Sequence, residues 1–286
     1  MEQNVTRRKA LSSVGLISGA VLLSGCAKSL GSSTVADPAS DRPKTLSDAG
    51  HAWKYVPLDP DELADRAYRM YPDGGCMYSM VGSVILTLAE RYGKPYSEFP
   101  FAMMRYGEGG VAKWGSLCGV VNGAAALIGL FYPEDAKTRE SLIGAFAHWY
   151  ESTQLPVYQP KDPPPGMEIS SSVAGSILCH FSVGKWCEAS GEPAFSKAKS
   201  ERCRRLTADG VKKLVTLLNE AHAQPERESI DMGQEAKACN SCHGKTELAD
   251  AMVKMDCRSC HDFTASHTTQ VGKGAPSLPG TAHGSQ

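Results

Sequence analysis

Two copies of the pattern Cys-x-x-Cys-His, close together in the last fifth of the chain, constrain this sequence more than any other feature. This spacing is typical of c-type haem attachment, because two thiols one turn apart are alkylated on one edge of the porphyrin and the adjacent imidazole binds the iron. The pattern therefore predicts two covalent haem c groups, with His243 and His261 as the proximal iron ligands. The predicted haem-binding residues are Cys239, Cys242, His243, Cys257, Cys260 and His261.

The same cysteines leave a second interpretation open, a structural zinc site with four Cys ligands. The 14 residues between the two pairs, 243–256, also suit a zinc ribbon. The histidine that follows each pair favours haem over zinc.

Composition bounds the class of protein. A chain of 286 residues with 42% hydrophobic content can bury a substantial core, and a net charge of -1 gives no basic excess for a nucleic-acid partner. No nucleophilic or hydrolytic constellation is present, and Gly107–Val111 does not follow a predicted strand as a nucleotide-binding loop would. We predict no catalytic residue and no nucleic-acid binding.

Residues 1–26 have the features of an export signal. Arg7 and Arg8 precede an apolar run that is too short for the roughly 20 residues of a membrane-spanning helix. The sequence around the paired arginines is twin-arginine-like, and Leu-Ser-Gly-Cys ending at Cys26 is lipoprotein-like, with cleavage before Cys26. We expect a periplasmic location or the outer side of the cytoplasmic membrane, with membrane contact only through an N-terminal lipid anchor and a tether over 27–50.

Hydrophobic periodicity predicts an all-α fold. One helical face recurs at a spacing of three and four residues, at Met77, Met80, Val81, Val84, Ile85 and Leu88. A short helix opens at Asp59 and runs through Met70, and Gly93 closes the next one. Further helices are expected over 118–130, 136–150, 172–188 and 195–222, with a proline-rich loop over 154–167. No segment shows sustained alternation of period two.

These patterns divide the mature chain into three parts. Residues 51–223 form the helical domain, 224–265 the haem segment and 266–286 a flexible Gly-, Ser- and Thr-rich tail. The haem segment is poor in apolar residues, so we expect the haems to supply its hydrophobic mass.

Five further cysteines lie at or within the predicted helices: Cys76, Cys118, Cys179, Cys187 and Cys203. Small buried hydrophobes or structural disulfides are the simplest interpretation for an exported protein. Glycines flank Cys118, however, and would let a backbone or an inorganic group approach closely.

The order of these cysteines resembles that of the redox-active proteins named for their C…GCAxxG…C…C pattern. The resemblance is carried by Gly75-Cys76, by 114–124 around Cys118, by 179–187, and by 201–206 with Asp209. With two CxxCH motifs appended, the whole sequence is similar to the split-Soret cytochromes c. One departure is that Leu117–Asn122 stands in place of GCAxxG, with the second glycine displaced to Gly123.

The resemblance implies a homodimer in which each chain holds two bis-histidine haem c groups and one iron-sulfur cluster, expected as [2Fe–2S]. Its matching cluster ligands are Cys76, Cys118, Cys179 and Cys203, with Cys187 as a fifth candidate. Because His222 closes the helix that leads into the haem segment, it is the favoured distal haem ligand. The other distal candidates are His51, His148, His180, His267, His283, Met252 and Met255.

The predicted function is that of an exported electron-transfer protein with two haem c groups, one iron-sulfur cluster and redox protein partners. One alternative is a small reductase that acts on a substrate at an open haem or at the cluster. The other is a thiol-redox or zinc-binding module that carries haems.

Overall fold

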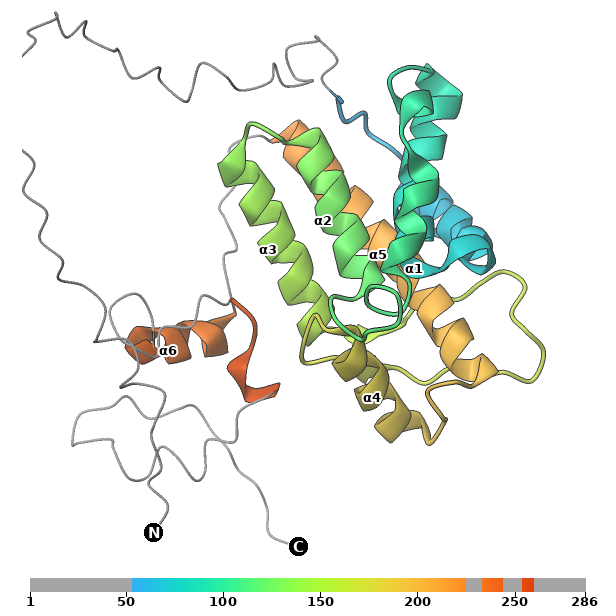
Figure 1. Ribbon diagram of the computed structural model, residues 1–286, viewed down its shortest axis with the longest axis vertical. Coiled ribbons are helices and arrows are strands. Elements are labelled where there is room, and N and C mark those ends of the chain that lie inside the picture. Colours follow the sequence, from blue (N-terminus) through green and yellow to red (C-terminus); the bar gives the residue numbers. More distant parts are fainter. Residues whose placement is uncertain (1–52, 225–232, 244–253, 260–286) are drawn as a thin grey trace, which may run out of the picture. The chain divides into compact units, whose positions relative to one another are not determined.

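The computed structural model describes residues 53–224, 233–243 and 254–259, and within them the chain is mostly helical (Figure 1). The α-helices are α1 Pro60–Tyr92, α2 Gly119–Phe131, α3 Ala136–Ser152, α4 Cys179–Ser190, α5 Lys197–Ala223 and α6 Gln234–His243. Short 3-10 helices are η2 Tyr96–Glu98, η3 Phe101–Gly107 and η4 Cys257–Ser259. The strands β1 Gln154–Leu155 and β2 Ser172–Val173 pair antiparallel. The predicted all-α class is confirmed at the level of a mostly helical chain.

Two helices predicted before Gly93 are one long, kinked helix in the structure. The Asp59 carboxylate caps the start of α1 by accepting from the main-chain N–H groups of Asp61 and Glu62, at 2.8 and 3.0 Å. Pro72 and Gly75 interrupt the helix, and Gly75 has φ 77° and ψ -166°. The sequence break between the two expected helices is therefore a kink rather than a loop.

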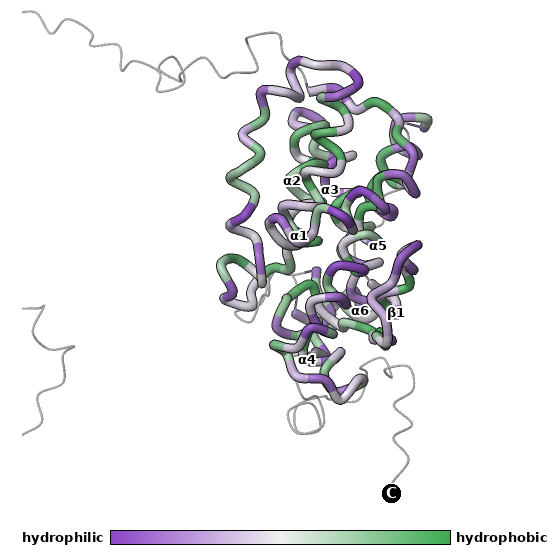
Figure 2. Tube along the Cα trace, turned by 90° about the vertical axis from the view of Figure 1, so that its right-hand side faces the viewer, coloured by the Kyte–Doolittle hydropathy of each residue, from purple (hydrophilic) through white to green (hydrophobic). Residues whose placement is uncertain are grey.

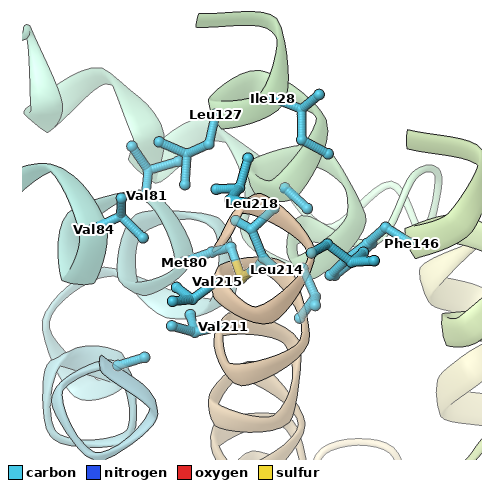
Figure 3. Close-up of a cluster of buried hydrophobic side chains, with 14 of the residues drawn as sticks. Met80, Val81, Val84, Leu127, Ile128, Phe146, Val211, Leu214, Val215 and Leu218 are labelled. Carbon is cyan, nitrogen blue, oxygen red and sulfur yellow. The ribbon is translucent and has the colours of Figure 1, made fainter. Parts of the chain in front are cut away.

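The core forms where α5 packs against α1, α2 and α3. Figure 3 shows its centre, where α5 residues meet side chains from the other three helices. Apolar and polar residues alternate along these helices (Figure 2), so each buries one face. The labelled core residues are Met80, Val81 and Val84 of α1, Leu127 and Ile128 of α2, Phe146 of α3, and Val211, Leu214, Val215 and Leu218 of α5.

The helix predicted over 172–188 begins later than expected, at Cys179. Ser172 and Val173 pair with Leu155 and Gln154, and the main-chain N–H of Gly175, which has φ 66°, donates to Glu151 at 2.8 Å. A strand of two residues is too short to leave an alternating pattern in the sequence, which is why this pairing was not predicted.

A buried charge pair within α5 also accepts a hydrogen bond from α1. The Tyr68 hydroxyl of α1 and the Arg205 Nε of α5 both donate to Glu201 Oε1, each at 2.8 Å. Glu201 is 5% exposed, so the guanidinium of Arg205 compensates a carboxylate that would otherwise be unfavourable in the core.

In the described part of the chain, no helix has both the length and the apolar character needed to cross a bilayer. The predicted leader 1–26, tether 27–50 and tail 266–286 lie outside the described residues.

The buried carboxyl of Asp209 should make stability depend on pH. Burial raises its pKa from 3.8 to about 6, against the hydrogen bond from the Val157 N–H at 2.8 Å, which lowers it. Because the folded-state pKa lies above the unfolded value, this contribution to stability is present at low pH and is lost as the pH rises through about 6. Relative to Asp209→Asn, wild type should lose about 2 kcal/mol of unfolding free energy between about pH 4 and pH 7. Urea unfolding of both proteins at the two pH values measures this difference. An equal change in the free energy of unfolding in wild type and Asp209→Asn would contradict the prediction.

Candidate metal centre

Main-chain pairing brings Cys118 and Cys179 together although they are distant in the sequence. The N–H of Cys118 donates to Ile177 O at 3.0 Å, and the N–H of Cys179 donates to Ser116 O at 2.7 Å. The N–H of His180 donates to Gly115 O at 3.0 Å, which extends the pairing by one more bond. Main-chain hydrogen bonds thus hold the two cysteines next to each other.

Three of the cysteines lie at the N-terminal end of a helical segment. Cys76 follows the kink at Gly75, Cys118 is the N-cap of α2, and Cys179 is the first residue of α4. A helix N-terminus carries unpaired N–H groups and a partial positive charge, both of which favour a thiolate.

One cavity of about 620 Å³ gathers all five cysteines that were predicted to form the cluster site. Cys203 joins it from α5, and Cys187 from the second half of α4. None of the five forms a disulfide. The alternative of structural disulfides among them is therefore wrong for this structure. The five cysteines on the cavity wall are Cys76, Cys118, Cys179, Cys187 and Cys203.

The electrostatics of the cavity favour one thiolate, at Cys118. The hydrogen bond from the Cys179 side chain lowers the pKa of Cys118 to about 6, against burial, which raises it. The same hydrogen bond raises the pKa of Cys179, and burial together with the charges of Cys118 and Cys203 raises that of Cys76 to about 12. One thiolate in the cavity therefore disfavours a second.

Arg202 adds a buried cation to the cavity wall. Its Nη2 donates to the carbonyl oxygen and to the Oγ of Ser182, at 3.2 and 2.8 Å, and its Nη1 lies 3.9 Å from Cys203 Sγ. Tyr150 donates to the same Ser182 Oγ at 2.8 Å. The sequence analysis missed this group. Its only signal was the arginine directly before Cys203, and sequence does not reveal burial.

Two glycines allow the close approaches that the site requires. A Cβ at Gly119 would lie 2.3 Å from Cys76 Sγ and 2.7 Å from Gly107 O, and one at Gly110 would lie 2.7 Å from Cys179 Cβ. The glycine after Cys118 therefore has a steric reason, as does the displaced Gly123, where a Cβ would lie 2.8 Å from Met80 Cβ.

The loop before Cys118 has an unusual run of left-handed backbone. Gly109 and Gly110 have φ 63° and 72°, and Val111, Ala112 and Lys113 follow with φ 58°, 48° and 67°. Positive φ is unfavourable for a residue with a Cβ, and most unfavourable for a β-branched one such as Val111. Gly109 and Lys113 lie on the cavity wall, so this strained turn forms part of it.

The first cysteines of the two CxxCH motifs also lie near each other. Cys239 lies in α6 and Cys257 opens η4, and burial, the charge of Cys257 and a hydrogen bond between the two side chains raise the pKa of Cys239. His243 is the exposed last residue of α6. Cys260 and His261 lie outside the described residues.

The structure does not bring His222 to the cysteine cavity. Both His222 and Cys203 lie on α5, and 19 residues at about 1.5 Å each separate them by roughly 28 Å. His180 lines the cavity, whereas the ring of His222 packs edge-on to Tyr55 with centroids 6.2 Å apart.

Comparison with known proteins first defines the class. Residues 79–217 match the family model of the redox-active proteins called C_GCAxxG_C_C, so the helical body has the cysteine pattern of that family. Split-Soret cytochrome c of Desulfovibrio desulfuricans is 36% identical over 274 residues, which cover 92% of this chain and 96% of the relative. This chain belongs to the split-Soret cytochrome c family.

A solved structure of the Desulfovibrio protein has the same fold. It matches with a TM-score of 0.70 and 38% identity, over 74% of this chain and 91% of that one. That structure is described as showing a novel iron centre in the split-Soret cytochrome c.

These findings correct the predicted cofactors and function. Two haem c groups with one [2Fe–2S] cluster is wrong as the cofactor set, because the relative is described by one novel iron centre. In the described ranges no group of three or more His, Cys, Asp or Glu side chains is close enough together to hold a metal ion, so the cavity supplies the ligand types of an iron centre but not its bonding geometry. The comparisons therefore support a cytochrome c relative with an iron centre, and not the predicted combination of cofactors.

The residues of the cavity fit an iron centre of some kind. Thiolates are soft ligands that iron accepts, and the cavity is far larger than one ion. The buried Arg202 Nε has no hydrogen-bond partner, so a donor is available to a bound group. Cys118 and Cys179, already in contact, are the first candidate ligands, and Cys203 and Cys76 complete the set.

Gly119→Ala should damage the site through backbone crowding. The new Cβ would meet Gly107 O at 2.7 Å and Met77 N at 3.0 Å, neither of which can move like a side chain. We expect a loss of roughly 1–3 kcal/mol in unfolding free energy. Gly129→Ala in the same helix has nothing within 4 Å of the new Cβ and should instead stabilise by about 0.5–1 kcal/mol. Urea unfolding of the two variants measures the difference, and similar values would show that Gly119 is not constrained.

Proposed function

We propose that this protein is an exported electron-transfer protein in which the cysteine cavity holds a non-haem iron centre. The observation that carries the proposal is the gathering of Cys76, Cys118, Cys179 and Cys203 from four helical segments around one cavity beside a buried guanidinium. Thiols collected from distant parts of a chain, yet not joined as disulfides, are typical of metal or redox sites.

The chain's own residues perform three tasks in this proposal. The main-chain pairing of 115–118 with 177–180 fixes the positions of Cys118 and Cys179. The helix N-termini stabilise their thiolates, and the left-handed turn encloses one side of the cavity. The bound iron supplies the change of oxidation state, and the residues around it tune its potential through charge and burial.

Export and assembly belong to the same proposal. The leader over 1–26 and the relationship to a cytochrome c support a periplasmic location. Twin-arginine export, lipidation at Cys26, homodimer formation and redox protein partners are part of the proposal as well. The paired arginines and the Leu-Ser-Gly-Cys sequence support the first two.

Replacing cavity cysteines should remove iron from the protein. In anaerobically purified full-length protein, Cys118→Ser and Cys203→Ser should each lose most of the non-haem iron, because a hydroxyl is a much poorer ligand for iron than a thiolate. Cys187→Ser is the matched control. Cys187 lines the same cavity but is the fifth cysteine, which the centre does not need, so this variant should retain iron. Iron and zinc analysis of each protein gives the measurement.

The alternatives predict different results. Zinc in place of iron in wild type would favour the thiol-redox or zinc module. Iron that is unaffected by both Cys118→Ser and Cys203→Ser would place the centre elsewhere in the chain.

The CxxCH motifs stay a prediction as haem-attachment sites. In the presence of haem-maturation machinery, haem stain should migrate with the chain in denaturing electrophoresis, because a thioether bond survives denaturation. Cys242→Ser should weaken the colour, and Ser241→Ala, between the two cysteines of the same motif, should not. A colourless wild-type band would rule out covalent haem.

A further inference from the structure

Arg202 is a buried cation without a carboxylate partner. Its residue is 1% exposed, and its best hydrogen bonds go to the neutral Ser182. Among the described residues, no carboxylate is paired with its guanidinium within 4.0 Å. A charge this far from water is strongly unfavourable unless a negative charge lies near it.

Arg205, one turn further along α5, shows how the chain treats an ordinary buried arginine. Its Nε lies 2.8 Å from Glu201 Oε1, and both side chains are 5% exposed. Arg205 therefore has its counter-ion within the fold. Arg202, on the side of the helix that borders the cavity, does not.

The Arg202 Nε is also buried without a hydrogen-bond partner. An unsatisfied donor on a charged group is more costly than one on a neutral group. The side chain borders the cavity, and besides Ser182 the guanidinium has Cys203 Sγ as an acceptor, 3.9 Å from Nη1. Both deficits, of charge and of a hydrogen-bond acceptor, would be corrected by an anionic group inside the cavity.

We infer that Arg202 is the counter-ion of the thiolate-bound centre and raises its reduction potential. The inference rests on the proposed iron centre in the cysteine cavity. Reduction adds one electron, and so one negative charge, to the centre, while the guanidinium stays protonated throughout. A fixed positive charge in a site of low dielectric stabilises the reduced state more than the oxidised state. Arg202 is thus a positioning and tuning residue rather than a ligand.

Redox titration of the holoprotein tests this inference. A mediator of known potential supplies the electron, and the optical spectrum reports the ratio of reduced to oxidised centre. In Arg202→Met this ratio should fall at least tenfold at a fixed solution potential, which is a shift of about 59 mV to lower potential for one electron. Arg202→Lys keeps the charge and should lie between Arg202→Met and wild type.

Arg204→Met is the control for removing one positive charge nearby. The Arg204 side chain is 25% exposed, its guanidinium lies over the Tyr68 ring, and it is absent from the cavity wall, so the ratio should change less than threefold. An equal shift in Arg204→Met and Arg202→Met would overturn the inference in favour of a general charge effect.

Iron content separates failure of the inference from failure of the proposed centre. Wild type without non-haem iron would refute the centre itself. Iron retained in Arg202→Met at an unchanged potential would refute the inference alone. If Arg202→Met loses iron, Arg202→Lys decides: iron retained supports a counter-ion, and iron lost points to packing of the guanidinium with Ser182 and overturns the inference.

Discussion

The packing of α5 against α1, α2 and α3 is the constraint on which the rest of this structure depends. Val211, Leu214, Val215 and Leu218 are all fully buried on one face of α5. At roughly 1.5–3 kcal/mol each, their burial provides on the order of 6–12 kcal/mol before the entropy of the chain is counted. This contact fixes the second half of the helix, and the first half then carries Arg202 and Cys203 to the cavity. One helix, α5, consequently contributes its second half to the core and its first half to the cavity.

The sequence predicted the parts of the fold that depend on local patterns. Helices at 118–130, 136–150 and 195–222 match α2, α3 and α5 closely, because each has a buried face of helical period and a local start signal such as Asp135 or Ser196. The kink at Gly75 and the late start of α4 were not predicted. The late start of α4 depends on long-range contacts, since the segment before α4 is held by bonds to Glu151 and to β1.

The candidate site was likewise only partly predictable from the sequence. The resemblance to the C…GCAxxG…C…C proteins selected the five cysteines as candidate ligands, whereas residue type alone also allowed small buried hydrophobes or disulfides. Their juxtaposition in one cavity required the fold, and the pairing of Ser116 with Cys179 has no local signal. Arg202 looked like any surface arginine in a run of charged residues. Its importance comes from burial and from the missing carboxylate, neither of which can be recognised from sequence. A count of cysteines likewise does not define a metal centre, because ligand number does not determine geometry.

The left-handed turn at Val111–Lys113 links the cavity to the stability of the whole body. Three residues with a Cβ in this conformation cost roughly 3–6 kcal/mol together, which is a large part of the stability of an ordinary domain. Their turn is held by main-chain bonds such as Lys113 N to Glu108 O at 3.0 Å and Ala112 N to Tyr106 O at 2.8 Å. Part of the free energy gained in packing the helices is therefore stored in one wall of the cavity. Because this wall forms only when the helices are packed, a group bound in the cavity would stabilise the whole helical body, although the cavity and the centre of the core share few side chains.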